Sequence, residues 1–333
     1  MDTIRVPMIF PGQASQAVGM GRDLAAAGGA AGALLARVDA TLRADLTRLM
    51  FEGPLETLTE TRNAQPAILA HSVAVALALR DLGIEPSAVA GHSLGEFSAA
   101  AVAGALTPEQ ALALVRRRGE LMFAAGRQRP GTMAAVMGLA AEVVREVCAA
   151  VAREHGSVVL ANHNSANQVV VSGEVAAVAA AGVALKAAGA RRVTPLNVSG
   201  AFHSPLLAEA AATFAADLES TDFADPGAPL VANVSGRPVT RGADLRSGLK
   251  RQLTSPVLWH DTMTWLIEGQ AERPRAILEV GPGQVLANLA RRAYPDVSFL
   301  SVGTVDELAG IRDQLAGLLA DGSRPGLEAR DGS

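Results

Sequence analysis

The stretch VAGHSLGEFSAA, residues 89–100, contains the pattern Gly-x-Ser-x-Gly around Ser93. An apolar run at 87–91 predicts a strand before this serine, and residues 94–104 have the spacing of a helix after it. At such a junction the serine lies on a tight turn, which needs glycines because a larger side chain would clash with the crossing backbone. The turn exposes the hydroxyl and points the amino end of the helix at an anion forming there. We interpret Ser93 as a nucleophile on an α/β fold, with a purely structural turn as the alternative.

Length and composition limit the class of protein that carries this turn. The chain has 333 residues, a length typical of about two domains. Hydrophobic residues make up 49% and aromatic residues only 3%, so we expect a core of alanine, valine and leucine. The formal net charge of -4 argues against nucleic acid or an anionic membrane as partner.

Several features bear on the compartment and the ends of the chain. The start, MDTIRVPMIFPG, lacks the basic region and the long apolar run of a signal peptide, and no apolar run reaches the length of a membrane span. The single cysteine, Cys148, excludes an intramolecular disulfide and reads as a small core residue. The polar, glycine-rich residues 321–333 predict a disordered tail. We therefore expect a cytoplasmic protein.

Short apolar strands alternate with helices along the chain, which predicts an α/β architecture. The strands are expected at 4–10, 87–91, 133–137, 158–161, 169–171, 192–195, 230–232, 276–280 and 298–302, and the helices at 65–82, 94–104, 107–126, 142–154 and 175–188. Residues 126–131 read as a linker, after which the order becomes β-α-β-β-α-β, the ferredoxin-like pattern. We expect an α/β-hydrolase-like catalytic domain formed by 1–129 and 199–320, interrupted by a ferredoxin-like α+β small domain at 130–198.

A serine hydroxyl needs a base and an oxyanion hole to act as a nucleophile. Six histidines could supply the base: His71, His92, His155, His163, His203 and His260. His203 is the best candidate because it follows the predicted small domain and precedes a helical stretch, but the residues alone leave the choice open. Leu94 offers one backbone donor, and the loop 10–13 could offer the second, although an ordinary Pro-Gly turn explains that loop equally well.

The chain also resembles a known family. The segments FPGQASQAVGMGRDL, TRNAQPAI, AGHSLGEFSA, LVRRRGELM, ANHNSANQVVVSG, VSGAFHSPLL, RQLTSPVLW and LEVGPGQVL occur in this order, between about residues 6 and 289. Together they closely resemble the malonyl-CoA:acyl-carrier-protein transacylases and the related acyltransferases of polyketide synthases. The FSA after GHSLGE and the RGELM run look more like discrete, trans-acting polyketide synthase acyltransferases than like fatty-acid enzymes.

The resemblance implies roles for the catalytic residues. Ser93 matches the residue that takes the acyl group as an ester, and His203 matches the base that accepts its proton and later activates the incoming thiol. In this family a backbone carbonyl orients the histidine, and Gln252 stands at the matching position. Gln13 and Leu94 match the backbone donors of the oxyanion hole.

The resemblance also implies how the substrate is chosen. Arg118 matches the arginine that holds the free carboxylate of malonyl, and a guanidinium suits this role because it presents a rigid fork and keeps its charge on burial. Arg116–Arg118 lie about 100° apart on a helix, so only one faces the pocket and the other two read as a solvated face. Phe202 matches the residue that excludes an α-methyl group, a distinction worth about 1–3 kcal/mol. Ala14 replaces a glycine of the family and would cost about 1 kcal/mol if its φ is positive.

The implied reaction moves a malonyl group from malonyl-CoA to the phosphopantetheine thiol of an acyl carrier protein through a malonyl-serine, in polyketide or fatty acid biosynthesis. It needs no metal and no organic cofactor, and we take a monomer as the default state. The alternatives are a transacylase or acyl hydrolase of the same fold that uses another acyl-CoA or acyl-carrier substrate, and a docking module with a decayed site. Arg118 argues against a generic esterase, which has no use for a buried cation.

Overall fold

The structure, a computed structural model, describes residues 2–198 and 200–320. Its larger sheet has six strands in the order β10-β9-β1-β2-β7-β8. The strands are β1 (Ile4–Phe10), β2 (Ile84–Gly91), β7 (Leu230–Ala232), β8 (Arg237–Val239), β9 (Ala276–Val280) and β10 (Ser298–Val302). Neighbouring strands run parallel except for β8, which pairs antiparallel with β7. The predicted α/β class is confirmed, and the predicted tail at 321–333 lies outside the described residues.

Helices cover both faces of the six-stranded sheet because its central strands are apolar on both sides. In β1, Met8 and Phe10 belong to the larger core cluster, whereas Ile9 packs on the opposite face with Trp259. The helices are α1 (Arg22–Ala27), α2 (Gly29–Leu42), α3 (Leu46–Glu52), α4 (Leu55–Thr59), α5 (Thr61–Asp81), α6 (Gly95–Val102), α7 (Pro108–Gln128), α10 (Ala208–Glu219), α11 (Gly242–Gln252), α12 (Trp259–Glu268), α13 (Val285–Arg291), α14 (Val305–Leu308) and α15 (Ile311–Ala320), with a 3-10 turn η1 at Pro205–Leu207. Among the described helices, none has the length and apolar character needed to span a bilayer.

The helix α7 begins as the sequence predicts but ends later. Thr107 caps it by accepting a hydrogen bond from the Gln110 amide, and a proline occupies the first helical position. The predicted linker at 126–131 is wrong, because α7 continues to Gln128 and the next strand begins at Gly131. Pro130 stops the helix, since a proline disfavours the helical backbone conformation in the residue before it.

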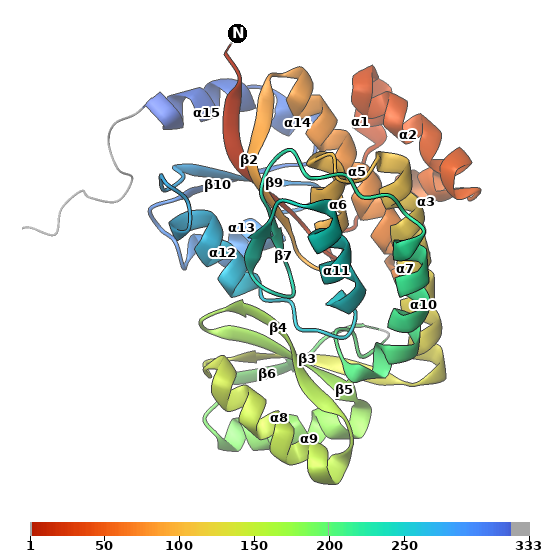
Figure 1. Cartoon of the computed structure of the whole chain (residues 1–333), viewed down its shortest axis with the longest axis vertical. Coiled ribbons are helices and arrows are strands. Elements are labelled where there is room, and N and C mark those ends of the chain that lie inside the picture. Colours follow the sequence, from red (N-terminus) through yellow and green to blue (C-terminus); the bar gives the residue numbers. More distant parts are fainter. Residues whose placement is uncertain (1, 199, 321–333) are drawn as a thin grey trace, which may run out of the picture.

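A second sheet of four strands lies below the first in Figure 1. It contains β3 (Gly131–Met137), β4 (Val158–Ser165), β5 (Gln168–Glu174) and β6 (Arg192–Pro195) in the antiparallel order β4-β5-β3-β6, with α8 (Ala141–His155) and α9 (Val175–Ala187) on its lower face. On that face Ala134 and Val136 pack around Cys148, whose burial raises the pKa of its thiol to about 11. The elements predicted for the small domain are present, and the boundaries 130–198 of a separate domain stay a prediction.

The two sheets also contact one another beyond the chain crossings. Met133 and Val170 of the four-stranded sheet belong to the main core of the larger one. Val257 donates to Ala161 O and accepts from the His163 amide, both at 2.9 Å, which adds a bridge between β4 and the segment before α12. These contacts bring β4 next to the carboxyl end of β2, where the side chain of His92 meets Asn164.

Candidate active site

Ser93 lies on the sharp turn between β2 and α6, in the left-handed region with φ 55°. The neighbouring glycines are required by close packing. A Cβ on Gly91 would lie 1.9 Å from the Gly95 carbonyl, and one on Gly95 would lie 2.2 Å from Phe10 O. The backbone therefore crosses itself as the Gly-x-Ser-x-Gly pattern indicates.

His203, which is 4% exposed, lies against this serine. Its Nε2 is 2.8 Å from Ser93 Oγ, and its Nδ1 is 2.9 Å from the backbone oxygen of Gln252. Burial, reinforced by the charge of Arg118, lowers the pKa of His203 to about 3, while the Gln252 carbonyl acts in the opposite direction. The ring is therefore neutral at pH 7, so Nδ1–H donates to Gln252 and Nε2 accepts from the serine hydroxyl. The structure brings together the predicted nucleophile, base and orienting carbonyl.

Arg118 is fully buried on α7 and points at the same hydroxyl. Its Nη2 donates to Ser93 Oγ at 3.0 Å and to Gln252 Oε1 at 2.9 Å, and its Nη1 donates to Gln65 Oε1 at 2.6 Å. Burial lowers the pKa of Arg118 to about 10 and the charge of Glu96 partly offsets this, so the guanidinium stays charged at neutral pH. A fixed cation thus lies beside the reacting oxygen.

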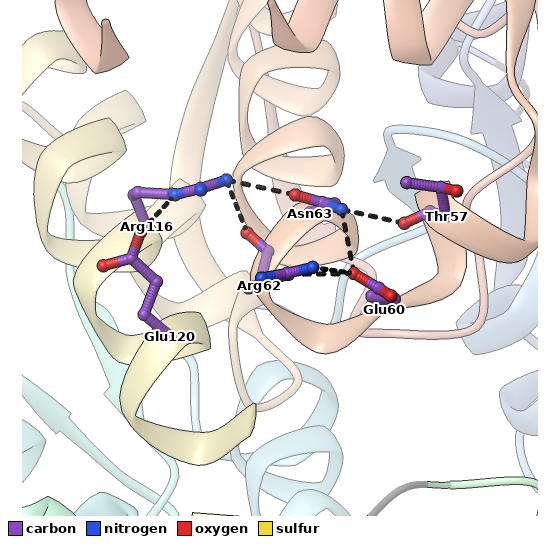
Figure 2. A network of polar contacts seen from close by, with 6 residues as sticks. All are labelled: Thr57, Glu60, Arg62, Asn63, Arg116 and Glu120. Carbon is purple, nitrogen blue, oxygen red and sulfur yellow. Dashed lines mark hydrogen bonds and ion pairs between the residues drawn. The ribbon is translucent and has the colours of Figure 1, made fainter. Parts of the chain in front are cut away.

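The neighbours of Arg118 point elsewhere, as helical geometry predicts. Arg117 pairs with Asp217 at 3.3 Å and is 46% exposed. Arg116 is not simply solvated: Figure 2 shows it reaching from α7 to α5, where its Nη1 donates to the backbone oxygen of Arg62 at 3.2 Å and to the Asn63 side chain at 3.1 Å. This contact ties together the two helices that carry Arg118 and Gln65.

Asn233, directly after β7, holds the turn in place. Its Oδ1 accepts from the Ser93 amide at 2.7 Å, and its Nδ2 donates to Gly91 O at 2.7 Å. Asn233 is not among the site residues predicted from the sequence. A polar side chain directly after the predicted strand 230–232 was the available signal, because the carboxyl ends of parallel strands meet at one edge of the sheet.

Glu96, in the first turn of α6, is a second buried residue of the site that is not among those predicted from the sequence. Its Oε2 accepts from Gln252 Nε2 at 2.5 Å, and its Oε1 accepts from the Asn233 amide at 3.3 Å. Burial raises the pKa of Glu96 to about 7, while the Gln252 and Asn233 hydrogen bonds and the charge of Arg118 lower it. Gln252 also donates from Nε2 to Ser93 O at 3.0 Å.

The loop after β1 lies beside the turn, as expected for a second donor. The His92 amide donates to Phe10 O at 3.0 Å and joins the two segments. Within the described residues, the amides of Gln13 and Leu94 donate to no other protein group. Ala14 has φ 81°, so the residue that replaces a family glycine does adopt the strained conformation.

The remaining residues of the sequence analysis lie around this site. Phe202 is buried beside His203 in the chain and belongs to the main core cluster. His92 points away from Ser93, with Nε2 3.0 Å from Asn164 Oδ1, and His71 is buried against Gly303 O. In the part of the chain that the structure describes, no group of three or more His, Cys, Asp or Glu side chains is arranged to hold a metal ion.

Comparisons with known proteins agree with this geometry. Residues 8–319 match the family model described as acyl transferase domain. The chain is 42% identical over 298 residues to a malonyl CoA-acyl carrier protein transacylase of Bacillus subtilis (strain 168), which covers 90% of this chain and 93% of that protein. It is similar to the crystal structure of an acyl carrier protein S-malonyltransferase from Vibrio cholerae, with a TM-score of 0.86, 38% identity and coverage of 92% and 99%. It is also similar to a malonyl-transacylase bound to a type II PKS acyl-carrier protein, PlMCAT:AntF, with a TM-score of 0.87, 39% identity and coverage of 94% and 100%.

Proposed function

The chain belongs to the acyl transferase family, and we propose that it is a malonyl-CoA:acyl carrier protein transacylase whose malonyl group is carried by Ser93. One observation supports this function above the others: the buried Arg118 guanidinium lies 3.0 Å from the nucleophilic oxygen. A fixed cation at that distance suits an acyl group that ends in a carboxylate, since malonyl places its charge a few bonds from the carbonyl carbon.

In the first step the Ser93 hydroxyl attacks the thioester carbonyl and His203 Nε2 takes its proton. The other proton stays on Nδ1 and is donated in a hydrogen bond to the Gln252 carbonyl, which stabilises the imidazolium. The amides of Gln13 and Leu94 donate to the oxyanion. The intermediate collapses, the C–S bond breaks, and His203 returns the proton to the leaving coenzyme A thiolate.

Substrate binding also adjusts the base. In the free protein the charge of Arg118 helps to lower the pKa of His203. When the malonyl carboxylate pairs with Arg118, it offsets that charge, so the imidazole becomes more basic at the stage where it must accept a proton. Malonyl is thus favoured in two ways: Arg118 binds its carboxylate, and the bound carboxylate offsets the charge by which Arg118 makes His203 less basic.

In the second step the phosphopantetheine thiol of a carrier protein attacks the malonyl-serine ester. His203 Nε2 takes the thiol proton and returns it to Ser93 Oγ as the ester C–O bond breaks. This covalent mechanism predicts ping-pong kinetics and requires neither a metal nor an organic cofactor. The carrier belongs to fatty acid or polyketide biosynthesis, and one of the similar solved structures is bound to a polyketide carrier.

The decisive experiment is mass spectrometry after mixing the protein with malonyl-CoA. We expect a malonyl adduct on the peptide that contains Ser93, and its loss when a phosphopantetheinylated carrier protein is added, with malonyl recovered on the carrier. Release to water at the same rate with and without carrier would instead identify an acyl hydrolase. A protein that forms no adduct would contradict the proposed function and identify a docking module.

A further inference from the structure

The chemical steps above do not use Glu96, although it is 1% exposed and lies among the reacting groups. Both of its oxygens accept hydrogen bonds from N–H donors, one from the Gln252 side chain and one from the Asn233 backbone. A carboxylate fits two donors better than a protonated carboxyl does, because the protonated form must place its own hydrogen against one of them. The hydrogen-bond pattern therefore favours the ionised form, and it opposes the burial that raises the pKa of Glu96 to about 7.

The orientation of the Gln252 amide depends on that charge. Its Nε2 donates to Glu96 Oε2 at 2.5 Å and to Ser93 O at 3.0 Å, while its Oε1 accepts from Arg118 Nη2 at 2.9 Å. In the reversed orientation the amide oxygen would face two acceptors, and the NH₂ group would face the guanidinium. Glu96, together with Ser93 O, thus fixes which end of the amide meets Arg118, and Glu96 is the charged member of the two.

We propose that Glu96 is a positioning residue for Arg118, acts through the side-chain amide of Gln252, and thereby sets the preference for acyl groups that carry a carboxylate. This inference rests on the proposed function. Glu96 also gives the buried Arg118 guanidinium a compensating negative charge, which a buried cation requires before the substrate binds. Glu96 forms no hydrogen bond with Ser93 Oγ or His203 among the described contacts, so its effect passes through Gln252.

The charges around Glu96 make the proposal sensitive to pH. The α7 helix contributes the charge of Arg118, while α11 and the segment after β7 contribute the uncharged amides of Gln252 and Asn233. The titratable ring of His203 joins the cluster through Ser93 Oγ. The pKa of His203 is lowered to about 3, whereas that of Glu96 is raised to about 7. A loss of malonyl preference just below neutral pH is therefore assigned to protonation of Glu96.

The test compares Glu96→Gln with a matched control, Glu279→Gln. Glu279 is also a fully buried carboxylate in a parallel-strand junction, where it accepts from the Leu286 amide at 3.0 Å and the Ala287 amide at 2.8 Å. Loading of Ser93 is measured by mass spectrometry with malonyl-CoA and with uncharged acetyl-CoA. In Glu96→Gln we expect the malonyl:acetyl ratio of kcat/KM to fall about 10- to 100-fold, mainly through the KM for malonyl-CoA. Glu279→Gln should keep the wild-type ratio.

A second measurement needs no variant. The malonyl:acetyl ratio of the wild-type protein should fall as the pH drops through about 7, where Glu96 takes up a proton. An unchanged ratio between pH 8 and pH 5.5, or an equal loss of both substrates in Glu96→Gln, would overturn the proposal because it would show a merely structural role. Failure of the proposed function looks different, since wild-type Ser93 would then form no malonyl adduct at all.

Discussion

Two strand-to-helix junctions at the carboxyl edge of the large sheet, β2 to α6 and β9 to α13, contain the same types of residue. Each has a turn rich in glycine and a buried glutamate, Glu96 in the first and Glu279 in the second. In the second junction the carboxylate accepts directly from the first amides of α13. In the first junction the carboxylate accepts instead from the Gln252 side chain and the Asn233 amide.

The difference lies in what each junction leaves unpaired. After β9, positive φ angles fall on Gly281 and Gly283. The glutamate accepts from the first amides of α13, so these amides are not free to bind an anion. After β2, a positive φ falls on Ser93 itself, and the Leu94 amide donates to no other described group. A junction of this sheet becomes reactive when its helix amides are kept for an anion and its strained residue carries a nucleophile.

The largest expected effect comes from Ser93→Ala, which removes the nucleophile and leaves the turn in place. Malonyl loading should fall by roughly 10⁵-fold or more, since removal of the nucleophile alone abolishes most of the rate enhancement of such a catalytic unit. The comparison variant Gly283→Ala, at φ 78° and with its Cβ no nearer than 4.0 Å to Ser15 O, should cost about 1 kcal/mol of stability and still load malonyl. Loading by mass spectrometry and thermal unfolding measure the two effects. Persistent loading in Ser93→Ala would show that another residue carries the acyl group.

The next largest effect is expected from Arg118→Ala. This substitution removes the buried cation that pairs with the malonyl carboxylate, and the lost binding free energy should lower kcat/KM for malonyl-CoA about 10²- to 10³-fold. Uncharged acyl thioesters should be loaded better relative to malonyl, because the cation that distinguishes them is gone. Arg117→Ala is the matched control, since Arg117 is 46% exposed and pairs with Asp217 away from the site. Malonyl transfer at the full wild-type rate in Arg118→Ala would refute the assignment.

The sequence predicts much of this arrangement, and the parts that it misses have a common cause. The strand Ile4–Phe10 and the capped start of α7 follow from local patterns of apolar and capping residues, and the structure confirms both. Glu96 and Asn233 stand in ordinary local contexts, and they acquire a role only through partners far away in the chain. Local periodicity carries no information on such contacts. The residues alone made His203 only the best of six candidate histidines, and the family resemblance assigned it as the base and supplied Arg118, because motifs record tertiary neighbours indirectly.

The pH dependence of unfolding should separate His203, which lies against Ser93 in the first junction, from Glu279 in the second junction by its sign. The folded pKa of His203 is lowered to about 3 from 6.5, so its neutral form contributes stability that is complete above pH 6.5 and is lost as the pH falls toward 3. Burial raises the pKa of Glu279, so its contribution is present at low pH and is lost as the pH rises through that raised value. The Tm difference between wild type and His203→Gln should therefore grow from pH 5 to pH 6.5, whereas that between wild type and Glu279→Gln should shrink as the pH rises above 4.5, the ordinary pKa of a glutamate. Shifts of roughly 2–4 °C per kcal/mol are expected in thermal unfolding. Slopes of the same sign would contradict this account.

The smallest effect is expected beside the reactive junction, at Ala14. Its φ of 81° belongs to the region that glycine adopts freely, so Ala14→Gly should raise the free energy of unfolding by up to about 1 kcal/mol. Loading of Ser93 should change little, because the substitution keeps the backbone amides of the loop. Ala149→Gly, at an exposed position inside α8, is the control and should destabilise by about 0.5–1 kcal/mol. Chemical denaturation measures both. If Ala14→Gly destabilised the protein as the control does, the loop after β1 would not be strained at Ala14.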